Sequence, residues 1–88
     1  MKNNPEFVLY SVAGKQILAP TGRQAADLNG MMTLSDIGAF IWKALDEETT
    51  FEQLLSKIMG KYEVDRETAE KDLNKFLDTL RSFQAILE

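Results

Sequence analysis

The side chains that most often carry out chemistry in proteins are scarce in this sequence. Its 88 residues include no histidine and no cysteine, which removes imidazole bases, thiolate nucleophiles and most transition-metal sites. The serines therefore have no histidine to activate them as nucleophiles. These serines are Ser11, Ser35, Ser56 and Ser82. We predict that the protein is not an enzyme and that it holds no cofactor.

Carboxylates are plentiful, but their spacing suits neither catalysis nor metal binding. The densest run is Asp46-Glu47-Glu48, and all three side chains fall in one exposed turn, as charge runs in solvated loops do. No pair of carboxylates stands in a recognisable arrangement with a nucleophile or an oxyanion donor. We predict a solvated loop at this run and no metal site.

Charge and hydropathy bear on two further classes of partner. The formal net charge is −4, and residues 46–88 carry six basic and eleven acidic side chains. Nucleic-acid affinity depends on Lys and Arg that neutralise phosphates, so this acidic half predicts no nucleic-acid partner. The longest apolar runs are three or four residues, which is too short for a signal peptide or a membrane helix. We predict a cytoplasmic protein with no membrane partner.

The first half of the chain has the pattern of strands. Phe7–Val12 and Gln16–Ala19 are rich in β-branched, aromatic and other apolar residues, which predicts two strands joined by a turn at Gly14-Lys15. Pro20-Thr21-Gly22 ends the second strand, and Met31-Met32-Thr33-Leu34 follows as a third. Because strand side chains alternate, one of these two methionines should face the core and the other should face outward.

The second half has the spacing of three amphipathic helices. Ser35 should cap the first helix, and Thr50 with Gln53 forms a capping box for the second. Asp65 should cap the third, which runs to about Ser82. Apolar residues recur every three or four positions. The predicted core positions are Ile37, Phe40, Ile41, Ala44, Leu45, Phe51, Leu54, Leu55, Ile58, Met59, Tyr62, Ala69, Leu73, Phe76, Leu77, Leu80 and Phe83.

Two features fall outside these helical stripes. Trp42 lies off the main stripe of the first helix, and packing against the second helix explains it most simply. The tail Gln84-Ala85-Ile86-Leu87 is apolar and should return as a short extended segment. The whole chain, 1–88, is therefore predicted to be a single α+β domain in which a three-stranded antiparallel sheet precedes three α-helices.

This order and its motifs resemble the PqqD family over Gly30–Leu87. The motifs are TLSDIGAFIWKAL from Thr33, TTFEQLLSKIMGKYEVD from Thr49 and TAEKDLNKFLDTLRSFQAIL from Thr68. No single motif is specific, whereas the ordered set is. The family closes on Gly-Leu or Gly-Val after the third helix, where this chain has Phe83-Gln84-Ala85-Ile86. We expect this departure to change the helix C-cap rather than the binding mode.

The resemblance implies a winged helix-turn-helix domain called a RiPP recognition element, which binds the leader segment of a ribosomally made precursor peptide. In the family, the leader pairs as an extra antiparallel strand with the third strand and lies against the third helix, which is strand addition to an open sheet edge. The implied partners are this precursor peptide and a maturation enzyme such as a radical SAM protein. The implied peptide-binding residues are Met31, Met32, Thr33, Leu34, Asp72, Lys75, Phe76 and Thr79.

Two alternative functions stay open on the sequence alone. A winged-helix DNA-binding regulator shares the helical trio, but a helix that enters a groove should carry a basic excess, and the third helix is balanced. Its basic residues are Arg66, Lys71, Lys75 and Arg81, and its acidic residues include Glu67, Glu70, Asp72 and Asp78. The other alternative is a non-catalytic adaptor that forms a homodimer through its hairpin.

Overall fold

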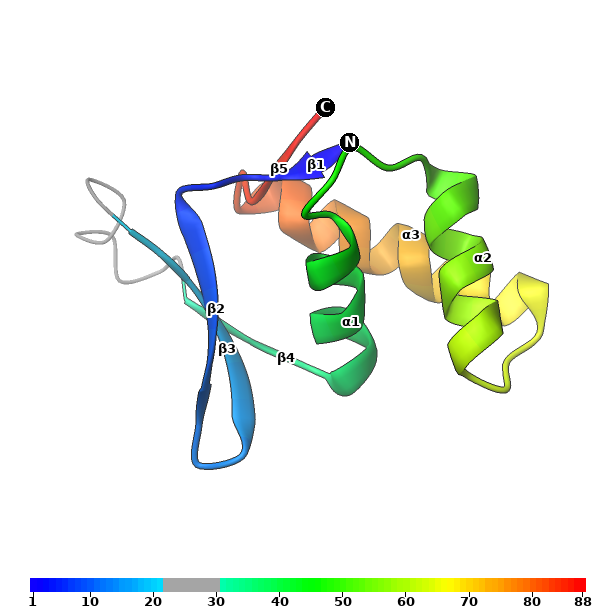
Figure 1. Ribbon diagram of the computed structural model, residues 1–88, viewed down its shortest axis with the longest axis horizontal. Helices are drawn as coiled ribbons and strands as arrows, with labels where there is room; N and C mark the ends of the chain where they lie inside the picture. Colours follow the sequence, from blue (N-terminus) through cyan, green and yellow to red (C-terminus); the bar gives the residue numbers. More distant parts are fainter. Residues whose placement is uncertain (22–30) are drawn as a thin grey trace.

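A three-stranded sheet lies beside three helices in the computed structural model, which describes residues 1–21 and 31–88 (Figure 1). The elements are β1 (Lys2–Asn3), β2 (Phe7–Val12), β3 (Lys15–Pro20), β4 (Met32–Leu34), α1 (Asp36–Ala44), α2 (Phe51–Lys61), α3 (Arg66–Ser82) and β5 (Ile86–Leu87). The antiparallel order β2-β3-β4, followed by three helices, confirms the predicted α+β class. Gly22, which the sequence placed at the end of a strand, and Gly30, where the family resemblance begins, lie outside the described residues.

The hairpin of β2 and β3 turns one residue earlier than predicted. Val12 pairs with Lys15, so the turn consists of Ala13 and Gly14, whose φ angles are 52° and 81°. A two-residue turn with positive φ at both positions follows the right-handed twist of the flanking strands. β3 therefore begins one residue earlier than expected, at Lys15. It also ends one residue later, because Pro20 still lies opposite Phe7.

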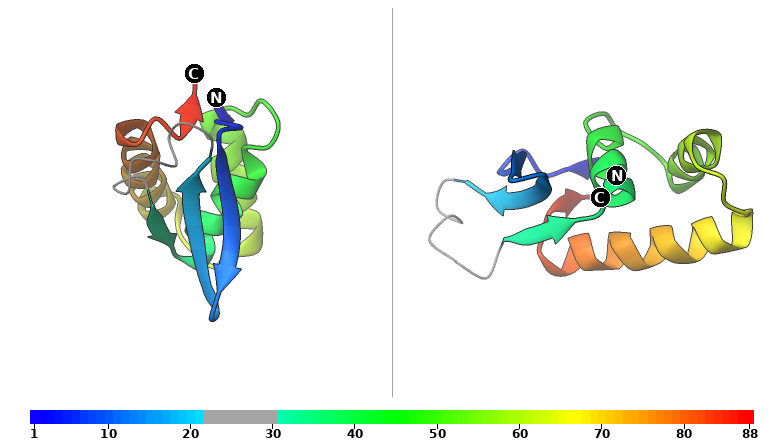
Figure 2. Two further views of the ribbon diagram at one scale, coloured as in Figure 1. Left: turned by 90° about the vertical axis from the view of Figure 1, so that its left-hand side faces the viewer. Right: turned by 90° about the horizontal axis from the view of Figure 1, so that it is seen from below.

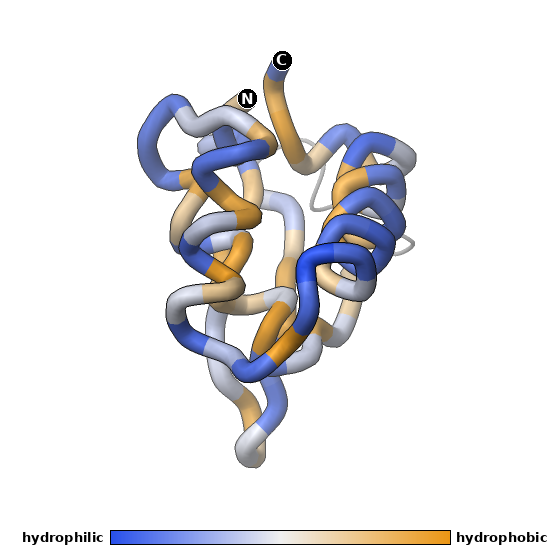
Figure 3. Tube along the Cα trace, turned by 90° about the vertical axis from the view of Figure 1, so that its right-hand side faces the viewer, coloured by the Kyte–Doolittle hydropathy of each residue, from blue (hydrophilic) through white to orange (hydrophobic). Residues whose placement is uncertain are grey.

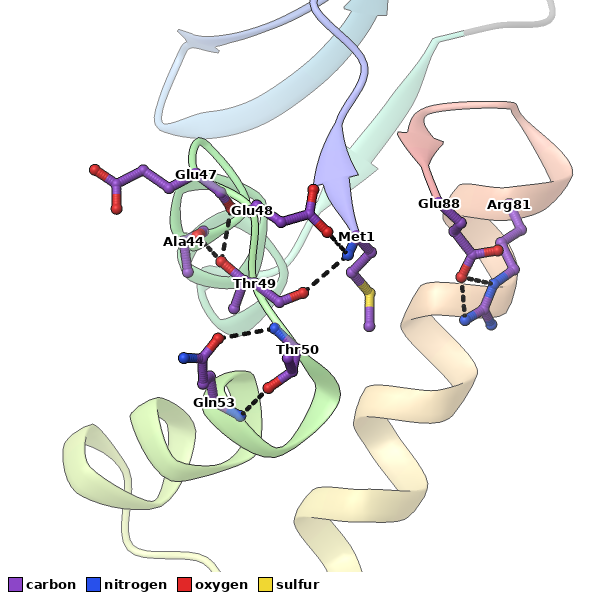
Figure 4. Close-up of polar contacts among 9 residues, drawn as sticks. All are labelled: Met1, Ala44, Glu47, Glu48, Thr49, Thr50, Gln53, Arg81 and Glu88. Carbon is purple, nitrogen blue, oxygen red and sulfur yellow. Dashed lines mark hydrogen bonds and ion pairs between the residues drawn. The ribbon is translucent and has the colours of Figure 1, made fainter.

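The three helices begin where local chemistry predicted. The Gly38 N–H donates to the Ser35 hydroxyl at 3.1 Å. Thr50 and Gln53 form a complete capping box, with hydrogen bonds of 2.9 and 3.2 Å (Figure 4). Asp65 occupies the N-cap of α3 as expected, but its side chain makes no capping hydrogen bond. A side-chain cap is worth about 1 kcal/mol, so α1 and α2 have better-defined starts than α3.

The core lies between the inner face of the sheet and the apolar sides of the helices, which Figure 3 shows turned inward along α3. Leu73, Leu77 and Leu80 of α3 are completely buried. Trp42 is also buried, and its ring meets Phe7 of β2 edge-on, with the ring centroids 6.4 Å apart. The sequence predicted the second helix as its neighbour. The ring contact with Phe7 joins α1 to the sheet, and packing of Trp42 against the second helix stays a prediction.

A second, very small sheet joins the two ends of the described chain. β1 pairs antiparallel with β5, so the apolar tail does return as an extended segment. The buried Asn4 reinforces this junction, because its side-chain amide donates to the Gln84 carbonyl and its backbone N–H donates to the Ala85 carbonyl, each at 2.8 Å. The sequence did not predict β1, since a strand of two residues has no periodic pattern.

Helix α3 ends in a Schellman motif that has glutamine in place of glycine. The Ala85 N–H donates to the Leu80 carbonyl at 2.8 Å, and the Gln84 N–H donates to the Arg81 carbonyl at 3.0 Å. These two bonds define the motif, whose left-handed residue is usually glycine, and Gln84 has a φ of 59°. The expected change of C-cap is therefore a change of residue only, because the backbone keeps the geometry that glycine favours.

Replacing Gln84 with glycine should stabilise the protein by about 1 kcal/mol, because a left-handed conformation strains every residue that has a Cβ. Its side chain is exposed, so the substitution removes little packing. Thermal unfolding followed by circular dichroism measures the effect. Ser82→Gly, two residues earlier at the last position of α3, is the matched control and should destabilise. A Gln84→Gly variant that melts at a lower temperature than the wild type would contradict the assignment.

Candidate functional site

The direction of the backbone groups in the sheet follows from one hydrogen bond. The Thr21 N–H donates to the Glu6 carbonyl at 2.6 Å, immediately beyond the Phe7–Pro20 pair. In an antiparallel ladder, hydrogen-bonded and non-hydrogen-bonded pairs alternate. The odd-numbered residues of β3 therefore direct their N–H and C=O groups towards β2, and the even-numbered residues direct theirs towards β4.

Strand β4 consequently leaves one of its residues open to another strand. Met32 and Leu34 lie opposite Leu18 and Gln16, the even-numbered residues of β3, so their backbone groups face β3. The N–H and C=O of Thr33 point the other way, to the open edge of the sheet. An incoming extended chain can form hydrogen bonds with both groups.

The side chains of this segment alternate as the sequence predicted. Met32 packs against the core and Leu34 is buried, whereas Thr33 is exposed on the opposite face. Met31 precedes the strand and is 52% exposed, so β4 is one residue shorter than expected. One methionine contacts the core and the other does not.

A groove opens where β4 ends, between α1 and α3. Its volume is about 320 Å³, and β4 runs beside the C-terminal part of α3 in both views of Figure 2. The lining residues are Ser35, Ile37, Gly38, Ile41, Asp72, Lys75, Phe76 and Thr79. The structure thus gathers all four predicted residues of α3 in one groove. The four predicted residues at β4 do not line it, but Ser35, which directly follows Leu34, does.

The sequence missed the contribution of α1 to this groove. Ile37 and Ile41 had been assigned to the core, and the structure shows Ile41 buried and Ile37 half-buried in the groove lining. Gly38 was not singled out. The available signal was its position inside a helix, where glycine costs about 1 kcal/mol relative to alanine and often marks a close approach of backbone to a neighbour.

Gly38 allows α1 to approach α3 at the groove. A Cβ at this position would lie 3.1 Å from Cε1 and 3.4 Å from Cζ of Phe76, whereas carbon atoms in favourable contact are about 3.5–4.0 Å apart. Phe76 is half-buried and forms part of the groove wall. The missing side chain at Gly38 therefore helps to set the position of the Phe76 ring.

The arginines of α3 are engaged in ion pairs on the protein surface. Arg66 contacts Glu52 at 2.9 Å and Glu70 at 2.8 Å, and its pKa is raised above the ordinary value, chiefly by the hydrogen bonds to Glu52. Arg81 pairs with Glu88 (Figure 4), and its hydrogen bonds lower the pKa of that carboxylate. Little unpaired positive charge is left on these faces for a polyanion.

The charges at the groove are arranged differently. Asp72 and Lys75 are both exposed and line the groove. Within residues 1–21 and 31–88, neither side chain forms an ion pair. The groove therefore combines an apolar wall with one open charge of each sign, which suits a peptide segment better than a nucleic acid.

The acidic run lies in the exposed turn between α1 and α2, as predicted. The Thr49 hydroxyl donates to the carbonyls of Ala44 and Glu47, which holds the turn, and Glu48 pairs with the N-terminal ammonium (Figure 4). In the described ranges, no cluster of three acidic, histidine or cysteine residues could hold a metal ion. None of the helices there has the length and apolar character needed to span a membrane.

Comparison with known proteins agrees with this geometry. Residues 6–85 match the family model described as coenzyme PQQ synthesis protein D (PqqD), and the chain therefore belongs to the PqqD family. This match includes the hairpin, which the resemblance seen in the sequence did not cover. No curated protein sequence matches the chain.

Two solved structures share the fold over nearly the whole chain. The structure of TbiB1 in complex with the TbiA(beta) leader peptide is 27% identical in sequence, covers 97% of this chain and 93% of its own, and superposes with a TM-score of 0.75. The structure of lasso peptide synthetase B1 complexed with the leader peptide is 20% identical, covers 99% and 96%, and has a TM-score of 0.74. Both confirm the strand and helix arrangement.

Proposed function

We propose that this chain binds the leader segment of a ribosomally synthesised precursor peptide by strand addition to β4 and presents the peptide to a modifying enzyme. The observation that carries the proposal is the open edge at Thr33 beside the groove between α1 and α3. Backbone pairing supplies affinity in this mode of recognition, and pockets for alternate side chains supply selectivity.

The relationship to TbiB1 supports the proposal, because that protein has a leader peptide bound and shares 27% of its sequence with this chain. Each of these residues would make a different kind of contact with the peptide. Thr33 offers its backbone N–H and C=O, Phe76 offers an apolar wall, and Asp72 and Lys75 offer charges at the rim. Without histidine or cysteine, the chain is best suited to binding, and the covalent chemistry falls to a maturation enzyme, such as a radical SAM protein, in the cytoplasm.

Titration of the ¹⁵N-labelled protein with a synthetic leader peptide tests this function. We expect a small precursor gene beside the gene for this chain, and the probe is the N-terminal segment of the peptide that it encodes. We expect the amide resonances of Met31–Leu34 and of α3 from Asp72 to Thr79 to shift on binding, while those of the distant hairpin turn stay in place. If the β4 and α3 resonances do not move at saturation, strand addition at this site is wrong.

The charge at Lys75 should contribute modestly to leader affinity. Lys75→Ala is expected to weaken binding by about fivefold at low salt and by less at high salt, because exposed charges are screened. Lys71→Ala is the matched control, since Lys71 is exposed on the same helix but does not line the groove. Isothermal titration calorimetry at two salt concentrations compares the two variants. An equal loss in both would assign the effect to net charge rather than to the groove.

A further inference from the structure

The sheet has a second open edge, at β2, on the side opposite β4. Hydrogen-bonded and non-hydrogen-bonded pairs alternate along β2 as they do along β4. The even-numbered residues of β2 form the hydrogen-bonded pairs with the odd-numbered residues of β3. The N–H and C=O groups of Leu9 and Ser11 therefore point away from the sheet. The N–H of Phe7 is already bonded to the Asn4 carbonyl at 3.0 Å.

Within residues 1–21 and 31–88, strand β2 lacks the features that usually keep an edge strand from pairing. Its sequence, Phe7–Val12, contains no charged residue and no proline, and its register with β3 is continuous, without a bulge. Val8, Tyr10 and Val12 on its outer face are 43%, 41% and 51% exposed, and no helix covers that face in the left view of Figure 2. Proteins usually protect such an edge with lysine, proline, a bulge or a covering segment.

The surface beside this edge is self-complementary in charge. A hollow of about 310 Å³ lies next to the strand and is lined by Asn3, Leu9, Trp42, Lys43 and Asp46. Lys43 and Asp46 are exposed, and neither makes an ion pair within the described parts of the chain. A twofold axis can place the positive residue of one copy beside the negative residue of the other copy, and the reverse.

We propose that two copies of this chain associate through antiparallel pairing of their β2 strands about a twofold axis. Leu9 and Ser11 of each copy supply the open backbone groups, and Lys43 of one copy faces Asp46 of the other. The two sheets then form one continuous sheet whose outer edges are the two β4 strands. Both leader grooves stay accessible, so dimerisation and leader binding are separate properties of opposite edges.

A strand of a modifying enzyme is the rival occupant of the β2 edge. A second copy carries the same lysine and aspartate at its own β2 edge, so two copies can form both ion pairs with no other charged group. This favours the dimer over a strand of an enzyme. Pairing of two six-residue strands covers less than the roughly 800 Å² per partner of a standard interface. We therefore expect a weak, concentration-dependent dimer.

Sedimentation velocity of the full chain over about a hundredfold range of concentration tests the pairing, because the dimer population follows mass action. The wild type should shift from monomer to dimer. Ser11→Pro removes one outward N–H and fills the edge with the proline ring, and should weaken dimerisation by at least tenfold. Ser11→Ala is the control and should dimerise like the wild type. A wild type that is monomeric throughout, or a Ser11→Pro variant that still dimerises normally, would overturn the proposal.

A charge exchange tests the same interface without changing the strand. Lys43→Asp and Asp46→Lys should each weaken the dimer, and the double variant should restore it, because the pairs then form in reverse. Leader binding separates this proposal from the function proposed above. Ser11→Pro should retain it, while Thr33→Pro should weaken it and still dimerise. If the two single variants and the double variant all dimerise equally, the charges do not face each other.

Discussion

Replacing Thr33 with proline should weaken leader-peptide binding by about ten- to a hundredfold while leaving the protein folded. Proline has no N–H to donate, and its ring occupies the position from which an incoming strand would be bound. The loss of a backbone hydrogen bond together with this obstruction corresponds to about 1.5–3 kcal/mol. Isothermal titration calorimetry with the leader peptide measures the effect.

The fold should tolerate this change because the Thr33 N–H points away from β3. The neighbouring Met32 and Leu34 keep their pairing with β3, and the residue before a proline prefers the extended conformation that Met32 already has. Thr33→Val is the matched control, since it removes the hydroxyl and keeps the backbone donor. A leader affinity that falls equally in both variants would mean that the side chain, rather than the backbone edge, binds the peptide.

The local parts of this fold could be predicted because their causes are local. The capping box of Thr50 and Gln53 and the cap at Ser35 need only residues three positions apart, and both are present. The alternation of the two methionines also needs no knowledge of the rest of the chain. The predicted turn was one residue late because Ala13 gives no sign that it will adopt positive φ.

The parts that could not be predicted depend on residues far apart in the sequence. The contact of Trp42 with Phe7, the pairing of β1 with β5 and the approach of Gly38 to Phe76 are all of this kind. The candidate site shows the same division. Its α3 half could be named from the family pattern, whereas its α1 half appears only when the two helices are placed side by side.

The same geometry argues against a DNA-binding role for α3. A recognition helix needs cations that are free to contact phosphates and bases. In this protein Arg66 and Arg81 each contact two carboxylates. Lys75, which is not ion-paired within the described residues, sits at the groove beside Asp72. The third helix, with four basic and four acidic residues, therefore presents a charge-balanced surface and a mixed-charge groove rather than a basic stripe.

Replacing Gly38 with valine should destabilise the protein by about 2–3 kcal/mol and should also weaken leader binding. The new side chain would begin 3.1 Å from the Phe76 ring, and overpacking of this kind costs about 1–3 kcal/mol. For a domain of this size, each kcal/mol lowers the melting temperature by about 4–8 °C. The displaced ring would enter the groove, so affinity should fall together with stability.

Gly60 provides the matched control for this prediction. It also lies inside a helix, α2, but a Cβ there would meet no atom within 4 Å, so Gly60→Val should be neutral or slightly stabilising through helix propensity. The difference between the two variants in thermal unfolding isolates the contact with Phe76. Adding Phe76→Leu to Gly38→Val should recover part of the lost stability, because residues in contact do not act additively. Equal melting temperatures for the two glycine variants would show that Gly38 does not hold α1 against α3.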